Sequence, residues 1–109
     1  MKLPKNIIIP DDKLTRYLLL PRAWDDKSKY LAQAGFTLNN PDILKKALAH
    51  LAETSETLQD ITSEYGEFLR TDGVLTGPNG RELAVTAVWL RWHIDGSIHF
   101  ITLKPRRGK

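Results

Sequence analysis

The chain has 109 residues, of which 41% are hydrophobic, and it carries a formal net charge of +3. This length is typical of a single domain, 1–109, and leaves nothing for a second core. The chain has no cysteine and its histidines show no metal-ligand spacing, so we expect no disulfide, no metal site and no cofactor. The apolar run that ends at Ile9 is too short for a signal peptide or a membrane span, which predicts a soluble cytoplasmic protein.

Helices are predicted in the first half of the chain, at about 10–58. The first begins after Pro10 and is stopped by Pro21, because proline cannot continue a helix. The second begins at Asp25, where acidic residues suit the helix dipole, and ends at Gly35, where glycine can take the left-handed conformation.

A third helix is predicted from Asn40, as the N-cap, through Pro41 to near Ser55, because proline suits the first helical position. Its apolar residues recur every three or four positions, as in a helix with one buried face. From Ser63 the period changes to two, which is typical of strands. The chain therefore divides into a helical half and a β half at about 63–105, and we expect the α+β class.

Two turns set the register of an antiparallel meander of at least three strands. The sequence Gly-Pro-Asn-Gly at 77–80 is typical of a type I turn followed by a bulge with Gly80 at positive φ. The pair Asp95-Gly96 suits a two-residue type I′ turn. The resulting pairs are Leu75 with Leu83, Leu69 with Trp89, Glu67 with Arg91 and Tyr65 with His93, and in the second hairpin Arg91 with Phe100 and Trp89 with Thr102.

These registers place alternating side chains on two faces of the sheet. We expect the three N-terminal helices to pack on the apolar face, because no other surface could cover their apolar stripes. The other face is expected to stay open. The apolar face holds Phe68, Val74, Ala84, Val88, Leu90, Trp92, Ile101 and Leu103, with His99 beside Trp92, and the open face holds Tyr65, Glu67, Trp89, Arg91, His93, Thr102 and Lys104.

The open face has the residue types that RNA cleavage without a metal needs. A carboxylate can take the 2′-hydroxyl proton, an imidazole can protonate the leaving oxygen, and a cation can stabilise the charge of the phosphorane. Glu67, His93 and Arg91 are the catalytic candidates for these roles, in that order. The candidates for substrate binding are Thr102 and Lys104, as phosphate contacts, and Tyr65 or Trp89, as a platform for base stacking.

The same residues also suit a sheet that binds a protein. Glu67 opposite Arg91 is a common cross-strand ion pair. Basic residues are concentrated in the tail, 104–109, and the rest of the chain is slightly negative, which disfavours general RNA binding. The alternative to a ribonuclease is therefore a non-enzymatic interaction module. Its partner would be a cognate protein, such as the product of a neighbouring gene, or a second copy of the chain bound through the sheet edge or the open face.

Short motifs are spread along the chain: Asp12-Lys13-Leu14-Thr15-Arg16-Tyr17-Leu18-Leu19, Asp25-Asp26-Lys27-Ser28-Lys29, Ala34-Gly35-Phe36, Tyr65-Gly66, Leu75-Thr76-Gly77-Pro78-Asn79-Gly80, Val88-Trp89 and Phe100-Ile101-Thr102-Leu103. Together they resemble an uncharacterised bacterial family that is frequent in cyanobacteria, over about Ile9 to Pro105. The resemblance implies relatives that are short stand-alone proteins or C-terminal domains of toxin-like proteins. More distantly, helices followed by a meander resemble the barnase, EndoU, colicin and RelE-type ribonucleases, which implies a site on the open sheet face. Before Phe-Ile-Thr-Leu this chain has His99, whereas the stand-alone members of the uncharacterised bacterial family tend to have lysine there.

Overall fold

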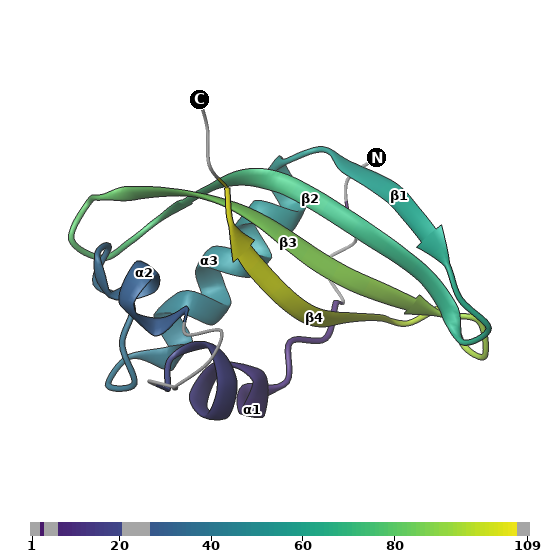
Figure 1. Cartoon of the computed structure of the whole chain (residues 1–109), viewed down its shortest axis with the longest axis horizontal. Coiled ribbons are helices and arrows are strands. Elements are labelled where there is room, and N and C mark those ends of the chain that lie inside the picture. The colour runs from purple at the N-terminus through teal and green to yellow at the C-terminus, as the bar shows by residue number, and fades with distance from the viewer. Residues whose placement is uncertain (1–2, 4–6, 21–26, 107–109) are drawn as a thin grey trace.

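A computed structural model describes Leu3, residues 7–20 and residues 27–106 of the chain (Figure 1). Helices precede strands, and the strands form one antiparallel sheet in the order β1-β2-β3-β4. The predicted α+β class with an antiparallel meander is confirmed. The elements are α1 (Asp11–Lys13), the π-helical turn η1 (Leu14–Leu18), α2 (Ser28–Ala32), α3 (Pro41–Thr54), β1 (Thr57–Thr62), β2 (Gly66–Thr76), β3 (Glu82–Trp92) and β4 (Ile98–Pro105).

The helical part differs from three regular helices. The single turn of α1 continues directly into the wider η1, and α2 has only five residues. The predicted stop at Pro21 and the predicted start at Asp25 lie outside the described residues. Gly35 follows α2 with a φ of +94°, as predicted for a helix C-terminus. The longest helix, α3, starts after Asn40 as predicted and has 14 residues.

The strand β1 lies at the edge of the sheet and was not predicted, because the sequence assigned Thr57 and Leu58 to the helical half. The chain passes from α3 to β1 through only two residues, Ser55 and Glu56. Only Thr57 of β1 is buried, so the strand lacks the apolar alternation by which strands are recognised.

The β2-β3 hairpin has the predicted register. Leu75 lies opposite Leu83, and the pairing continues without a shift to Gly66 opposite Trp92. The Gly80 N–H donates to the Gly77 carbonyl oxygen at 2.9 Å, and Gly80 has a φ of +86°. The turn is therefore the predicted type I turn with a glycine bulge.

The helices cover the opposite face of the sheet from the one predicted. The pairs that face them are fully buried, whereas Phe68, Val88, Trp92 and Ile101 are only half-buried and Val74 is 49% exposed. The expectation is wrong because both faces of β2 and β3 carry large apolar side chains, such as Trp89 on one face and Trp92 on the other. The polar residues that suggested an open face lie at a strand end that extends past the helices (Figure 1). The buried pairs are Leu69 with Trp89, Thr71 with Ala87 and Leu75 with Leu83.

The predicted register of the second hairpin is also wrong. The connection spans 93–97, and the Trp92 N–H donates to the Ser97 carbonyl oxygen at 2.9 Å. A bulge opposite Val88 and Trp89 shifts the pairing again and turns Leu103 to the helix side, where it is buried. The observed pairs are Arg91 with Ile98, Trp89 with Phe100, Val88 with Thr102 and Ala87 with Leu103.

The side chain of Asp95 organises this longer connection. Its Oδ1 accepts hydrogen bonds from the Ser97 hydroxyl at 2.7 Å and from the Ser97 N–H at 2.9 Å. These bonds favour the ionised carboxylate and lower the pKa of Asp95 below 3.8. The connection therefore has its own local stabilisation, which a two-residue turn would lack.

A buried polar chain joins three strands beneath the helices. The Trp89 indole N–H donates to Thr71 Oγ1 at 3.1 Å, and Thr71 Oγ1 lies 2.6 Å from Thr57 Oγ1. The Trp89 ring also packs edge-to-face on Phe100, with centroids 5.5 Å apart. The N-terminal segment covers the free side of β4, where the Ile8 N–H donates to the Ile98 carbonyl oxygen at 2.8 Å.

We expect Trp89→Ala to destabilise the protein by about 3 to 5 kcal/mol, because it removes a fully buried ring and its hydrogen bond. Trp92→Ala is the matched control on the same strand and the opposite face, and it should cost clearly less. Urea denaturation of both variants measures the difference. A larger cost at Trp92 would contradict the observed orientation of the sheet.

We expect the thermal stability of Asp95→Asn to depend on pH differently from that of the natural chain. Because folding lowers the pKa of Asp95, its ionised carboxylate stabilises the fold above the unfolded-state pKa, and this contribution is lost as the pH falls through the lowered value. The variant should melt slightly lower at pH 7, and the two melting temperatures should converge near about pH 2. A gap of the same size at both pH values would contradict this account.

Candidate functional site

The residues assigned to one site from the sequence lie in separate parts of the molecule. The end of the sheet that carries the β1-β2 and β3-β4 connections, here called the distal end, holds Tyr65, Glu67, Arg91 and His93. Trp89 lies in the core beneath the helices. The second half of β4 holds the remaining pair, Thr102 and Lys104. The structure thus groups the catalytic candidates with one binding candidate, Tyr65.

Glu67 and Arg91 form an ion pair on the helix-side face of the distal end, beyond the helices. Arg91 donates to Glu67 Oε1 from Nη2 at 2.7 Å and from Nε at 3.1 Å. Their side chains are 30% and 36% exposed respectively, so the pair is partly shielded from water. Because both bonds reach Oε1, Oε2 is the atom through which Glu67 could act as a base.

His93 occupies the next position along the same ladder. Its N–H donates to the Tyr65 carbonyl oxygen at 2.9 Å, and its ring Nε2 lies 3.3 Å from the Ser63 carbonyl oxygen. A neutral ring that donates from Nε2 keeps Nδ1 as an acceptor. The imidazole therefore lies about 7 Å along the strand from the Glu67–Arg91 pair, at a distance that one phosphodiester group could bridge.

The ring of Trp89 is fully buried and offers no face for stacking, so the expectation of an exposed platform there is wrong. Thr102 Oγ1 donates to Tyr17 Oη at 3.2 Å, and this atom also accepts from Lys27 Nζ at 2.9 Å. These bonds join β4 to η1 and to the start of α2. Thr102 therefore takes part in a contact between elements, at some distance from the Glu67–Arg91 pair.

Lys104 lies opposite Thr86 on the outer face of the sheet, the face turned away from the helices. This position is five residues along β3 from Arg91, or about 17 Å. The surrounding hollow has a volume of about 450 Å³ and contains cations and carboxylates together, including Arg70 and Asp72. Lys104 and Arg91 therefore cannot bind the same phosphate.

A row of rings on the outer face of the distal end was not predicted as a site. The Trp92 ring packs edge-to-face on Tyr65 and on His99, with centroids 6.3 Å and 6.0 Å away. His99 thus lies beside Trp92 as predicted, and its Nε2 is 3.0 Å from Ser97 Oγ. Leu90 is buried by this row and lies outside the main core cluster.

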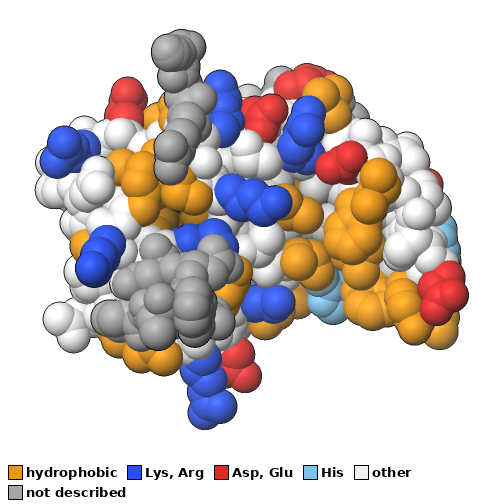
Figure 2. Space-filling view, viewed as in Figure 1, with side chains coloured by type: hydrophobic (Ala, Val, Ile, Leu, Met, Phe, Trp, Pro, Cys, Tyr) orange, Lys and Arg blue, Asp and Glu red, His pale blue; other side chains and the backbone are white. Residues whose placement is uncertain are grey.

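Large apolar side chains are exposed around this row of rings. Ile94 in the β3-β4 connection is 89% exposed, Ile61 in β1 is 67% exposed and Tyr65 is 61% exposed. Figure 2 shows hydrophobic side chains gathered over this end of the sheet. The isolated isoleucines at 61 and 94, the second of them next to the predicted Asp95-Gly96 turn, were the sequence signal that could have found this surface. The distal patch, as we name it, comprises Ile61, Tyr65, Phe68, Leu90, Trp92 and Ile94.

Exposed carboxylates lie in the connections at the distal end. Glu64 and Asp95 are exposed there, whereas Asp60 lines the hollow that also holds Arg70 and Lys104. This end of the molecule is therefore acidic, although the whole chain has a positive net charge.

Within residues 7–20 and 27–106 and at Leu3, no group of three or more His, Cys, Asp or Glu side chains is placed to hold a metal ion. No helix in the same part of the chain is long and apolar enough to cross a membrane. The side chains of the distal end offer two kinds of chemistry: proton transfer by Glu67 and His93, or contact with another surface through the distal patch.

Comparison with known proteins gives the fold a context. No curated protein sequence matches the chain. The fold is similar to that of a chain in the solved structure of a contact-dependent growth inhibition toxin–immunity protein complex from Klebsiella pneumoniae 342, with a TM-score of 0.67 and 18% identity over 91% of this chain and 99% of that one. A family described as a domain of unknown function, DUF6883, matches residues 2–107, and the chain therefore belongs to this family.

Proposed function

We propose that this chain works in a toxin–immunity type of system and binds a cognate protein through the distal patch. The observation that carries the proposal is the gathering of exposed apolar side chains at one end of the sheet, where Ile94 is 89% exposed. The similarity to a chain of a toxin–immunity complex supports this kind of partner.

The composition of the distal patch supports a protein as the partner. Exposed aromatic and aliphatic side chains that cluster together mark interaction surfaces, because burying them on association is favourable. The Trp92 ring is held between Tyr65 and His99 by edge-to-face contacts, so little side-chain freedom would be lost on binding. Such a fixed tryptophan is a typical centre of a binding hot spot.

The charge around the patch indicates the chemistry of the partner. Glu64 and Asp95 lie in the connections beside the apolar residues, so a complementary surface would carry lysine or arginine around an apolar centre. The same carboxylates oppose a polyanion such as RNA, whose binding needs several cations in one place. A basic protein surface therefore suits this end better than a nucleic acid.

We expect Ile94→Lys to weaken binding to the protein encoded by the neighbouring gene by about tenfold or more, because it places a charge in the apolar centre and repels a basic partner. Isothermal titration calorimetry of the purified proteins measures the effect. The side chain is almost fully exposed, so the melting temperature should change little.

Leu38→Lys is the control for that experiment. Leu38 is an exposed side chain of the same size as Ile94, but it lies between α2 and α3, away from the distal end. It should leave the affinity unchanged. Equal losses in the two variants, or full affinity in Ile94→Lys, would show that the partner does not use the distal patch.

A second candidate function is cleavage of RNA without a metal. It is favoured by one observation, which is that a carboxylate, a guanidinium and an imidazole lie at the same end of the sheet: Glu67 pairs with Arg91, and His93 bonds through its main chain to Tyr65. Glu67 would take the 2′-hydroxyl proton, His93 would protonate the leaving oxygen, and Arg91 would stabilise the phosphorane. The Tyr65 ring takes no part in this site, because it packs against Trp92 on the outer face.

If this second function is present, Glu67→Gln and His93→Gln should each abolish cleavage of total cellular RNA in the presence of a metal chelator. Neither change removes a buried apolar group, so both variants should melt close to the natural chain. Gel electrophoresis of the RNA gives the result, and toxicity on expression that the neighbouring gene relieves would accompany it. Intact RNA at high protein concentration would rule out the activity, and cleavage that survives both substitutions would rule out this site.

A further inference from the structure

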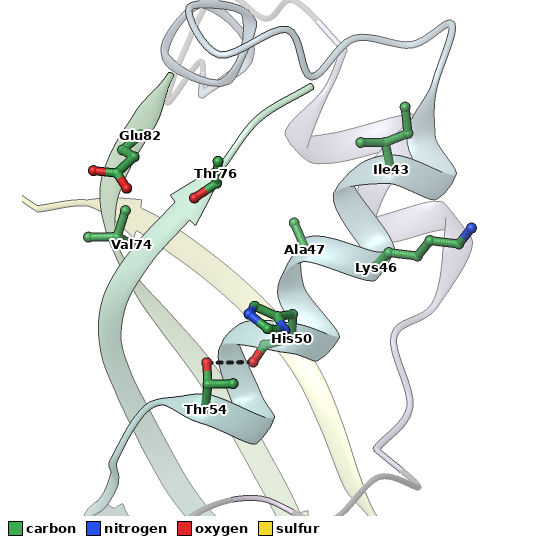
Figure 3. Close-up of a pocket in the computed structure, with 8 residues that line it drawn as sticks. All are labelled: Ile43, Lys46, Ala47, His50, Thr54, Val74, Thr76 and Glu82. Carbon is green, nitrogen blue, oxygen red and sulfur yellow. Dashed lines mark hydrogen bonds between the residues drawn. The ribbon is translucent and has the colours of Figure 1, made fainter. Parts of the chain in front are cut away.

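Among the residues that the structure describes, no strand lies beside one edge of β2 over part of its length. β1 pairs with β2 from Thr62 opposite Glu67 only as far as Thr57 opposite Thr71, and β2 continues to Thr76. Beside this free part lies a hollow of about 490 Å³ between β2 and α3 (Figure 3). It lies at the end of β2 opposite the distal patch and is lined by Ile43, Lys46, Ala47, His50, Thr54, Val74, Thr76 and Glu82.

The hydrogen bonds at both ends of the β2-β3 ladder show which main-chain groups are unpaired at this edge. The Gly77 N–H donates to the Arg81 carbonyl oxygen, and the His93 N–H donates to the Tyr65 carbonyl oxygen, each at 2.9 Å. In an antiparallel ladder every second residue bonds to a given neighbour, so the odd-numbered residues of β2 bond to β3. The pair of Thr57 with Thr71 is then a non-hydrogen-bonded pair whose flanking bonds still join Asp72 to the β1 side. Val74 and Thr76 are therefore the residues that direct their N–H and C=O groups to the free edge.

Gly73 explains why a groove forms here. A Cβ atom at Gly73 would lie 2.5 Å from Leu51 Cδ1 and 2.8 Å from Ser55 Oγ, so the C-terminal end of α3 sits directly on the β2 main chain. From this contact the helix and the strand diverge towards Ile43 and Thr76 (Figure 3). The result is a wedge with a helix as one wall and unpaired main-chain groups as the other.

The free edge lacks the features that usually prevent strand pairing. Proteins protect such edges with lysine, proline, bulges or inward-pointing charges. Here the Asp72 carboxylate is held on the outer face, where it accepts a hydrogen bond from Thr86 Oγ1 at 2.6 Å. Val74, in the middle of the edge, is 49% exposed and apolar.

We propose that this groove binds an extended segment of a partner protein, which adds to the sheet as a strand paired with residues 74–76. Only an extended main chain presents donors and acceptors at the spacing of Val74 and Thr76. The side chains of the segment that face α3 would be small and apolar beside Ala47 and Ile43. The site lies away from the distal patch and does not depend on it.

The charges in the groove add a preference to this site. The α3 wall carries His50 and Lys46 and no carboxylate among the residues that line the groove, whereas Glu82 lies on the strand wall. The Lys46 side chain extends away from β2 in Figure 3, so it would meet the segment at the rim. An acidic residue of the segment would therefore lie towards α3 and away from Glu82.

Substitution by proline tests the free edge in the whole chain. At Val74 proline removes an N–H that bonds to no strand, and the preceding Gly73 tolerates the proline ring, so Val74→Pro should fold with a melting temperature close to the natural one. Leu75→Pro is the matched control, and it should unfold the protein because it removes a bond to β3 and a buried side chain. Equal loss of folding in both variants would overturn the edge assignment.

Nuclear magnetic resonance tests the binding. The probe is a blocked heptapeptide, Thr-Val-Thr-Ala-Thr-Glu-Thr, added up to about 5 mM, since a short strand should bind with a Kd near about 1 mM. We expect shifts and slower amide exchange at Val74 and Thr76. Val74→Pro should weaken binding about tenfold or more, and Val74→Thr should not.

Three results would overturn the proposal. The first is no shift with peptide, and the second is binding of unchanged strength to Val74→Pro. The third is protection of the same amides that rises with protein concentration in the absence of peptide, together with a doubled mass, because a second copy of the chain would then occupy the edge.

Discussion

The long pairing between β2 and β3 is the constraint on which the rest of the structure depends. Each strand has 11 residues, and their register has no shift from one end to the other. A ladder of this length spans about 37 Å, whereas the 14 residues of α3 span only about 21 Å. The helical part therefore covers the middle of one face and the β2-β3 turn, where Asn79 donates to the Gln33 and Ala34 carbonyl oxygens, and leaves the distal end extending past it. The distal patch is the surface that this mismatch in length exposes.

The sequence contained enough information for the register of the first hairpin but too little for its orientation. Pro78 and Gly80 fix the turn by their allowed φ angles, and the turn fixes every pair in the ladder. The choice of buried face depends on a contrast between faces that is absent here, since Trp89 and Trp92 lie on opposite sides of one strand. In the second hairpin, the hydrogen bonds of Asp95 to Ser97 and the bulge in β4 depend on geometry that residue types alone do not specify.

The candidate site was partly predictable for the same reason. Glu67, Arg91 and His93 share a face in any register that keeps the first turn, so their grouping did not depend on which face is covered. Trp89 has the same parity along β3, but the face changes from exposed to covered between Arg91 and Trp89. The odd or even position of a residue in a strand indicates its face of the sheet but not whether a helix covers it there. Trp89 was therefore assigned to the open site although it lies in the core. The residues of β4 were displaced by the bulge, which no turn sequence indicated.

The two candidate functions of the distal end both involve the β3-β4 connection, which contains His93 and Ile94. Trp92 faces outwards and Arg91 faces the helix side, so a protein bound on the distal patch would leave the Glu67–Arg91 pair uncovered. His93 is different, because its main chain is bonded to Tyr65 and it lies between Trp92 and Ile94 in the chain. A partner that covers Tyr65 and Ile94 would therefore reach the imidazole but not the carboxylate. If the chain cleaves RNA, such a partner would inhibit it by restricting His93, and the ion pair would keep its geometry in the complex.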